Sequence, residues 1–443
     1  MMNGVWPVGF SWTFSEANQI DTTRDHYENF PYPPRDPADE QHRLLTPALD
    51  CFDMLNHYGF GGARDFEDEF TVLVAGGGTG DSTIFLAEQL KSTSNKVVHV
   101  DISQQSIDVA KERAQVRGLT NIEWRQANLL NLNSSEIGTF DYINCTGVLH
   151  HLPDPSMGLA SITSLLKDDG VLGLMVYGQY ARTGVYQLQN LLRHLNKDAD
   201  QEKKVSNAKS VLSQLPDTNW FKRGSELFGD HRLGDAGIYD LLLHEQDRAY
   251  TIAELIGLLG DHGLMLSKLV DSWLYDPGRY LQSEDLETQI ATLDPTEQMS
   301  VAELVSGTLK THTLYAHKNR CAEPEFGLDK VISLTLSNDT SIYSRFHRLI
   351  VENLREPKVS FSHENNSIDL EPSEALAAAL KHTDGERSIA EILKRATMRG
   401  KAKRRDVLRA LEAFYKTLNT YDMAFLRSSA VARYRTKKEL HGA

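Results

Sequence analysis

The stretch that decides the fold is VLVAGGGTG at residues 72–80. Its apolar first half has the composition of a buried strand, and a helical pattern follows the glycines at residues 82–91. A strand, a glycine turn and a helix together place backbone groups and the positive N-terminal end of the helix against a ligand. Glycine is needed in the turn because a side chain would block the approach of the ligand. Two familiar loops are excluded: a dinucleotide fingerprint would need glycine at Asp81 or Thr83, and a Walker loop would need Gly-Lys. We therefore predict a ligand site of another kind at this turn.

Strand and helix patterns alternate outward from this turn, which predicts a mostly parallel α/β sheet. Seven strands are expected, at residues 71–75, 96–101, 122–126, 140–146, 170–176, 264–271 and 311–317. We expect no clear helix of Rossmann length between the last two strands. Residues 183–250 interrupt the alternation between the fifth and sixth strands with a polar, mostly helical insertion, which we expect over the mouth of the sheet.

The two flanking regions have different patterns, and they predict three domains. Prolines in YENFPYPPRDP, residues 27–37, favour an ordered extended arm rather than a helix, and a helix is expected at 44–58. Near the other end, residues 359–370 resemble strand, and residues 373–382, 388–396 and 404–418 are helical in pattern. The expected domains are an arm with a lid helix (1–70), a core (71–330, with the insertion) and a small α+β domain (331–443).

Four blocks of sequence carry a resemblance to a known family. Besides the GxGxG turn, they are DIS at 101–103, ANL at 127–129 and FDYINCTGVLHHLPD at 140–154. Their order and spacing over residues 45–317 resemble class I S-adenosylmethionine-dependent methyltransferases. The resemblance implies a Rossmann-like seven-stranded sheet, S-adenosylmethionine as cofactor and methyl transfer as activity. The cofactor-binding residues it implies are Gly76, Gly78, Gly80, Asp81, Asp101, Ile102, Asn128, Leu129, Asn144 and Thr146.

The resemblance also assigns parts of the cofactor to these residues. The glycines would pack under the methionine part, Asp101 would hold the ribose hydroxyls and Asn128 would face the adenine amine. Asn144 and Thr146 would line the carboxypropyl end. Many relatives carry an acidic residue where this chain has Val74, so Asp81 or backbone carbonyls would receive the methionine ammonium. The alternative for Asp101 is a helix cap.

Two histidine-containing motifs supply candidates for a general base. His150 and His151 follow the fourth strand, at the sheet edge where ligands bind, unless they are structural loop residues. His244 and Tyr250 belong to LHEQDRAYT, which is either an acceptor pocket or a junction capped by Thr251. Tyr177 and Tyr180 follow the fifth strand and are expected on the acceptor side.

Both flanking regions resemble parts of other enzymes. The arm resembles the segment before the core in an uncharacterised bacterial group of methyltransferases, and loosely that of outer-membrane-protein lysine methyltransferases. It would act as a lid through Tyr27, Tyr32 and Arg35, or only pack on a neighbouring subunit or the last domain. Residues 359–427 resemble the winged-helix module of peptide-modifying enzymes. That module would dock a peptide strand, or only pack on the core or a second copy in a homodimer.

Composition narrows the classes of function. The chain has 443 residues, 40% of them hydrophobic, and a net charge of −14, which disfavours nucleic acid as partner. It has no long apolar stretch for a membrane and no metal-site spacing, and the far-apart Cys51, Cys145 and Cys321 fit a reducing cytoplasm. The favoured function is methyl transfer to an N or O atom of a small metabolite. The alternatives are a methyltransferase of peptide or protein side chains and a cofactor-binding regulator without turnover.

Overall fold

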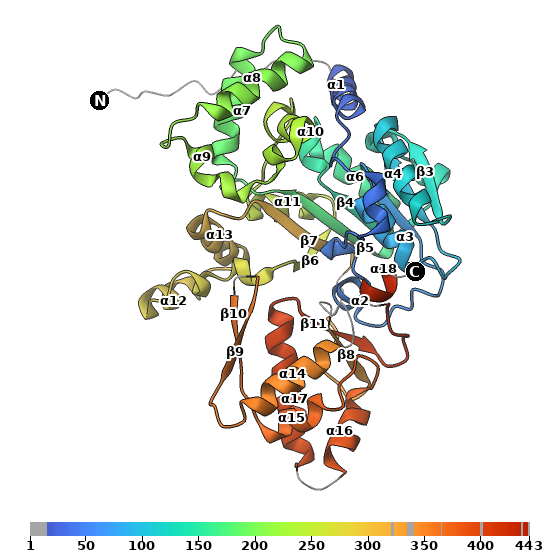
Figure 1. Ribbon diagram of the computed structural model, residues 1–443, viewed down its shortest axis with the longest axis vertical. Coiled ribbons are helices and arrows are strands. Elements are labelled where there is room, and N and C mark those ends of the chain that lie inside the picture. Colours follow the sequence, from blue (N-terminus) through green and yellow to red (C-terminus); the bar gives the residue numbers. More distant parts are fainter. Residues whose placement is uncertain are drawn as a thin grey trace.

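The computed structural model describes residues 16–319, 323–334, 341–364, 366–398, 402–435 and 437–441. Cys321 lies outside the described residues. Figure 1 shows a central sheet with helices on both faces, the insertion at one end and the C-terminal region at the other. Within the described part of the chain, no helix is both long enough and apolar enough to cross a membrane.

The central sheet has seven strands in the order β3-β2-β1-β4-β5-β7-β6. They are β1 (Val72–Ala75), β2 (Val97–Asp101), β3 (Ile122–Gln126), β4 (Phe140–Thr146), β5 (Leu166–Tyr177), β6 (Met265–Leu269) and β7 (Thr311–His317). Neighbouring strands run parallel, except that β7 is antiparallel to both β5 and β6. Every predicted strand has its counterpart, which confirms the Rossmann-like α/β class.

Both faces of the sheet are buried, because alternate residues along each strand point to opposite sides. Leu73 belongs to an apolar cluster under α6 and α11, whereas its neighbour Val72 belongs to a second cluster under α2 and α3. The helices around the sheet are α2 (Phe52–Phe60), α3 (Asp81–Gln89), α4 (Gln104–Val116), α5 (Ser134–Ile137), α6 (Pro155–Leu165) and α11 (Ile252–Asp261). Thr251 and Glu254 form a capping box on α11, which confirms the capping interpretation of that junction.

Three expectations about helices are wrong. Residues Glu16–Asn29 form helix α1, so the extended arm begins only after Asn29. The carboxylate of Glu28 accepts the N–H of Gln104 at the start of α4, a tertiary contact that the local pattern does not encode. The helix expected at 44–58 begins at Phe52, after Pro47 and a short 3₁₀ turn. Helices α12 (Glu284–Ile290) and α13 (Pro295–Ser306) lie between β6 and β7.

The insertion after β5 is helical, as predicted. It contains α7 (Thr183–Leu195), α8 (Gln201–Ser213), α9 (Trp220–Gly224), α10 (Gly234–Ile238) and a π-helical turn, Tyr239–Leu243. Its apolar side chains form a cluster of their own, against which Phe30 of the arm packs. The rings of Phe30 and Tyr239 stack with centroids 4.9 Å apart. Arm and insertion therefore meet at the carboxyl end of the parallel strands (Figure 1).

The C-terminal region has a separate apolar cluster and packs on the sheet domain. Its strands are β8 (Lys330–Leu334) and β11 (Ala424–Ser428), paired antiparallel, and the hairpin β9 (Val359–His363) and β10 (Asn366–Leu370). Its helices are α14 (Ser341–Glu352), α15 (Glu374–Leu380), α16 (Ile389–Thr397), α17 (Arg404–Thr420) and α18 (Lys437–His441). The domain boundaries and the winged-helix likeness stay predictions.

Candidate functional site

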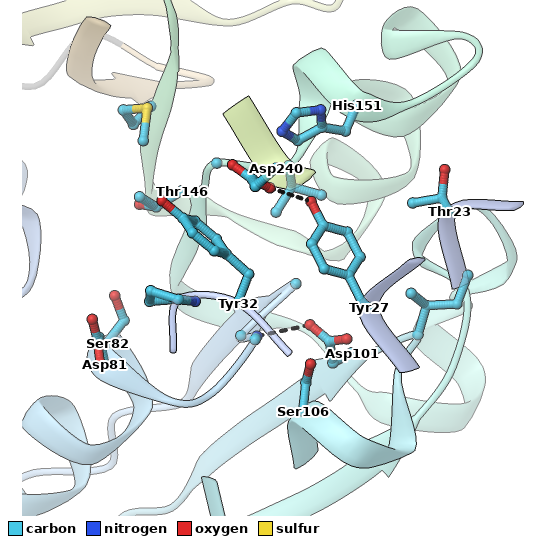
Figure 2. Close-up of a pocket in the computed structure, with 18 of the residues that line it drawn as sticks. Thr23, Tyr27, Tyr32, Asp81, Ser82, Asp101, Ser106, Thr146, His151 and Asp240 are labelled. Carbon is cyan, nitrogen blue, oxygen red and sulfur yellow. Dashed lines mark hydrogen bonds between the residues drawn. The ribbon is translucent and has the colours of Figure 1, made fainter. Parts of the chain in front are cut away.

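A cavity of about 490 Å³ lies at the carboxyl ends of β1, β2, β4 and β5. Strand ends and the loops after them form its floor, and the arm and the insertion form its other walls (Figure 2). Among the predicted cofactor residues, those that line it are Gly76, Gly78, Asp81, Asp101, Ile102, Asn128, Leu129, Asn144 and Thr146. This is the position where ligands bind in open α/β sheets.

The glycine turn brings backbone to the cavity wall. Gly76 and Gly78 have φ values of 74° and 52°, in the left-handed region that favours glycine. A Cβ at Gly78 would lie 2.7 Å from the carbonyl oxygen of Tyr32, so the arm packs directly on the turn. Gly80 does not line the cavity. A Cβ there would lie 2.8 Å from the Cβ of Ala110, so Gly80 permits α3 and α4 to pack closely.

The Asp101 carboxylate is fixed at the end of β2. One oxygen accepts the N–H of Gly78 at 2.7 Å and the other accepts the N–H of Ser103 at 2.8 Å. Burial raises the pKa of this carboxyl above its usual range, and the two backbone donors oppose that shift. The cap of α4 is Ser103, so the helix-cap interpretation of Asp101 is wrong.

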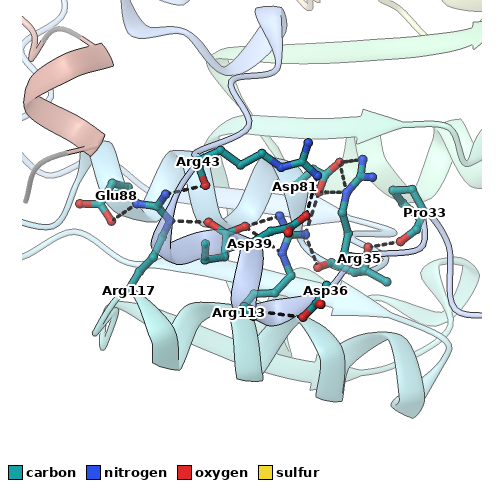
Figure 3. Close-up of polar contacts among 12 residues, drawn as sticks. Pro33, Arg35, Asp36, Asp39, Arg43, Asp81, Glu88, Arg113 and Arg117 are labelled. Atoms are coloured by element: carbon teal, nitrogen blue, oxygen red, sulfur yellow. Dashed lines mark hydrogen bonds and ion pairs between the residues drawn. The ribbon is translucent and has the colours of Figure 1, made fainter.

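Asp81 is neutralised by two arginines. Arg35 reaches it at 2.6 Å and Arg113 at 2.7 Å (Figure 3). Burial raises the pKa of the Asp81 carboxyl, but the hydrogen bonds and charges of Arg35 and Arg113 outweigh it and hold the pKa below its usual value. With its charge compensated in this way, Asp81 is a weak receptor for a ligand ammonium.

The arm connects the glycine turn to the insertion. Tyr27 donates a hydrogen bond to Asp240 at 3.1 Å, and Tyr32 donates one to Asp230 at 2.5 Å. Thr79, within the turn, donates to the carbonyl of Pro33 at 2.7 Å. Figure 2 shows the Tyr27 ring between Asp101 on one side and Asp240 on the other. Tyr27, Tyr32 and Arg35, the three predicted lid residues, all line the cavity.

Behind the arm, buried ion pairs attach its base to the core. Glu40, only 6% exposed, binds Arg113 at 2.6 Å and also Arg117. Removing one member would leave a buried charge unpaired, which is strongly destabilising. The tip of the arm thus lines the cavity and its base packs on the core, a partner that the sequence did not predict, while the lid role stays a prediction.

Of the four predicted catalytic residues, only His151 lines the cavity. Its Nδ1 lies 2.9 Å from the carbonyl of Gln246. A carbonyl only accepts, so Nδ1 carries the proton and Nε2 is the ring nitrogen with a free lone pair. The His151 ring stacks on His244 with centroids 3.9 Å apart, and Asp240 lies close to it (Figure 2).

The other candidates lie behind the cavity wall. His150 stacks on Tyr177 at 3.7 Å, and burial lowers its pKa well below the usual value. Burial likewise lowers the pKa of His244, whose Nδ1 accepts the N–H of Gln246. Burial raises the pKa of Tyr250 to about 12. Tyr177 lines the cavity, but Tyr180 does not and is 36% exposed.

Sequence reasoning missed several acidic and polar wall residues. Asp240 lies in the π-helical turn YDLLL, where burial raises its pKa to about 6. In the sequence, the one feature that could have predicted this wall residue is a single carboxylate within an otherwise apolar run. Asp230 and Arg182 line the same half of the cavity. Arg182 is held by Asp247 at 2.5 Å and lies 3.7 Å from the Tyr177 ring centroid, so its charge is largely engaged.

Comparison with known proteins agrees with this geometry. Residues 73–172 match a protein-family model described as a methyltransferase domain. The match identifies a methyltransferase domain in this part of the chain, in agreement with the sheet order and the glycine turn described above. An uncharacterized protein of Synechococcus is 32% identical over 239 residues, covering 53% of this chain and 57% of that protein. The chain thus spans little more than half the length of this curated relative.

Other similar proteins cover different parts of the chain. The ubiquinone biosynthesis O-methyltransferase of Actinobacillus pleuropneumoniae is 35% identical over 91 residues, 20% of this chain and 38% of that enzyme. The structure of PKMT2 from Rickettsia typhi has a TM-score of 0.63 at 18% identity, covering 90% of this chain and 78% of that one. At this identity the likeness concerns the fold alone, but it includes the C-terminal region.

Proposed function

We propose that the protein is an active methyltransferase that uses S-adenosylmethionine to methylate an amine nitrogen of a small metabolite. The observation that carries the proposal is one continuous cavity with two different halves. One half has the glycine turn and Asp101. The other has the carboxylates of Asp230 and Asp240, the hydroxyls of Tyr27 and Tyr32, and the His151 ring.

The first half fits the cofactor. Gly76 and Gly78 keep bare backbone at the cavity wall, where there is no space for a Cβ. The carboxylate of Asp101 can accept hydrogen bonds from two neighbouring ribose hydroxyls. Asn128 lies at the adenine end, where its Oδ1 already accepts the N–H of Leu130 and keeps a second lone pair. When bound, S-adenosylmethionine supplies a methyl group on a positively charged sulfur.

The second half fits a cationic acceptor. Asp240 and Asp230 bring two carboxylates to the cavity wall, and burial strengthens the attraction between such groups and a cation. A neutral alcohol would lack this ion-pair attraction, and a carboxylate acceptor would be repelled by Asp230 and Asp240. An amine arrives protonated and must lose a proton before its lone pair can attack. Asp240 and the Nε2 of His151 are the groups that can take that proton.

The arm and the insertion would exclude water from the transfer. Displacement at a methyl group depends mainly on alignment of nucleophile, methyl and leaving group, so positioning supplies much of the acceleration. Tyr27 and Tyr32 contact the insertion from the arm and would hold the acceptor half in a fixed shape. The same acidic wall fits a lysine side chain, so a peptide or protein acceptor is the second candidate.

A labelling experiment separates these possibilities. The purified protein is incubated with cofactor carrying ¹³C in its methyl group and with a cell lysate, and the lysate is then divided into protein and small-molecule fractions. We expect a new N-methyl signal by NMR in the small-molecule fraction. Asp240→Asn should greatly weaken the signal, whereas Asp235→Asn, an exposed change on α10 of the insertion, should retain it.

Other outcomes contradict particular parts of the proposal. Label in the protein fraction would favour the second candidate, and an O-methyl signal would exclude the amine. Calorimetry that detects cofactor binding, with no transferred label in either fraction, would favour the regulator. Absence of cofactor binding by the folded protein would overturn the proposal as a whole.

A further inference from the structure

A buried carboxylate lies behind the cavity at the end lined by Asn144 and Ser82. Asp50 is fully buried, in the 3₁₀ turn Ala48–Asp50 that precedes α2. Its Oδ1 accepts hydrogen bonds from the amide of Asn144 at 2.8 Å and from the hydroxyl of Tyr142 at 3.0 Å. Its Oδ2 accepts none from the described residues, although the Ser82 hydroxyl lies close enough to lower the pKa of the carboxyl.

The contact with Asp50 fixes the orientation of the Asn144 amide. A carboxylate can only accept, so the amide must turn its NH₂ group toward Asp50. Its oxygen, a hydrogen-bond acceptor, is then the part left for the cavity, which Asn144 lines. The cavity end next to Ser82 therefore presents acceptors, with a carboxylate directly behind them.

Among the described residues, no counter-charge pairs with the Asp50 side chain. Burial raises the pKa of its carboxyl to about 6, and the groups that oppose the shift are the neutral side chains of Ser82, Asn144 and Tyr142. No basic side chain among the described residues contributes to that pKa. Asp81, the other carboxylate at this end, is paired with two arginines. A ligand cation at this end would thus find Asp50 uncompensated and Asp81 already neutralised.

The turn that carries Asp50 is held rigidly. The carbonyl of Leu49 accepts the hydroxyl of Tyr315, from β7, at 2.6 Å. It also shares the single hydroxyl proton of Tyr142, from β4, with Asp50 Oδ1, and both distances are 3.0 Å. Gln89 of α3 donates to the Asp50 carbonyl at 2.8 Å. Because three elements hold the turn, Asp50 cannot move toward solvent when the cavity fills. Its charge stays at one place behind the wall.

We propose that Asp50 positions Asn144 and supplies the negative charge that holds the α-ammonium group of the cofactor's amino-acid end. The proposal rests on the proposed function, since it requires an S-adenosyl ligand with its amino-acid part near Asn144 and Ser82. Asp50 acts through Asn144 and through its field, so it is a positioning residue. Val74 of β1 lines the cavity but carries no charge that could attract the ammonium group. Asp50, which lies outside β1, would supply that charge instead.

Calorimetry with two ligands tests the proposal. S-adenosylhomocysteine carries the ammonium group, and methylthioadenosine shares its nucleoside and sulfur but lacks the amino-acid end. Asp50→Asn should weaken binding of S-adenosylhomocysteine by about tenfold or more, the scale of a hydrogen bond to a charged group. It should leave binding of methylthioadenosine unchanged. Asp53→Asn is the control, because burial also raises the pKa of the Asp53 carboxyl, but this side chain bonds to Ser333 of the C-terminal region, and the change should alter neither affinity.

Other outcomes of the calorimetry would overturn the proposal for Asp50. Equal losses for both ligands would make Asp50 a structural residue and overturn the proposal, as would an unchanged affinity for S-adenosylhomocysteine. If Asp50→Asn does not fold, the unaltered protein decides with the deaminated analogue of S-adenosylhomocysteine, which should bind at least tenfold more weakly than S-adenosylhomocysteine itself. Equal binding of the two would overturn the proposal. Binding of S-adenosylhomocysteine by the unaltered protein tests the proposed function separately.

Discussion

At the scale of single residues, the cavity depends on carboxylates whose surroundings give them different tasks. Asp101 is held by backbone donors, Asp81 by arginines, and Asp240 by a tyrosine next to a histidine. The Asp101 position was predictable, because its distance from the glycine turn is set by one strand and one helix. Asp240 and Asp230 were not, because their partners Tyr27 and Tyr32 lie 213 and 198 residues away.

Replacing Asp101 tests the cofactor half of the cavity. Asp101→Asn removes the charge that would accept hydrogen bonds from the ribose, and we expect S-adenosylhomocysteine to bind about 1.5–3 kcal/mol more weakly. Asp108→Asn, an exposed change on α4, is the control and should leave affinity unaltered. Calorimetry on variants with native circular dichroism measures both, and equal affinities for the two variants would exclude a ribose role for Asp101.

The raised pKa of Asp240 predicts a pH dependence. Since burial raises this pKa to about 6, the carboxyl is ionised above pH 6 and becomes neutral as the pH falls below it. An acceptor ammonium is therefore attracted above pH 6 only, and kcat/KM for the acceptor should fall as the pH is lowered through that value. Asp240→Asn should give a low kcat/KM without this acid limb. An unchanged acid limb in the variant would assign it to another group.

At the scale of elements, local sequence patterns predicted those strands and helices that local interactions stabilise. The strands of the sheet were predictable because apolar runs such as Val72–Ala75 lie between glycine turns and amphipathic helices. Helix α1 was not, because its sequence is polar and its end is held by contacts with α4, such as Glu28 to Gln104. The three-dimensional neighbours of a segment, which decide such cases, are absent from its own sequence.

The contact between arm and glycine turn leads to a prediction at this scale. Gly78→Ala adds a Cβ that would lie 2.7 Å from the Tyr32 carbonyl, so the arm must move off the turn. We expect weaker cofactor binding and faster proteolysis near residue 32. Gly138→Ala is the control: its φ of 83° also disfavours alanine, but nothing lies within 4 Å of the added atom.

The two variants separate strain from displacement of the arm. Both should lose about 1 kcal/mol or more of unfolding free energy, because alanine disfavours a positive φ. Only Gly78→Ala should lose cofactor affinity. If both retain it equally, the arm does not cover the bound cofactor, and its contact with the turn serves packing alone.

At the scale of the whole molecule, the C-terminal region completes the core of the sheet domain. Phe425 of β11 belongs to the apolar cluster that contains Phe52 and Leu55 of α2. Tyr58 donates a hydrogen bond to Asp422 at 2.6 Å, and Asp422 in turn accepts the N–H of Asp271 at 2.8 Å. Deleting residues 330–443 would expose this surface, so a truncated protein cannot test substrate recruitment cleanly.

A single hydroxyl at this interface should affect both parts of the molecule. Tyr58→Phe removes one of the two hydrogen bonds to the buried Asp422 carboxylate, and we expect the free energy of unfolding to fall by about 1–3 kcal/mol. Unfolding in urea should remain one transition. Tyr280→Phe, which removes a less buried hydroxyl bonded to the Leu274 carbonyl, should cost less. Two separate transitions in the unaltered protein would contradict the joint core.

The contact between α2 and β11 also determines when the protein can finish folding during its synthesis. His57 accepts the N–H of Leu426, which lies 369 residues further along the chain. A ribosome delivers the amino end first, so the strands around the glycine turn emerge long before β11. Until β11 emerges, the apolar face of α2 that it covers stays exposed to solvent. Chaperones that recognise such faces are therefore expected to hold the nascent chain until β11 has emerged.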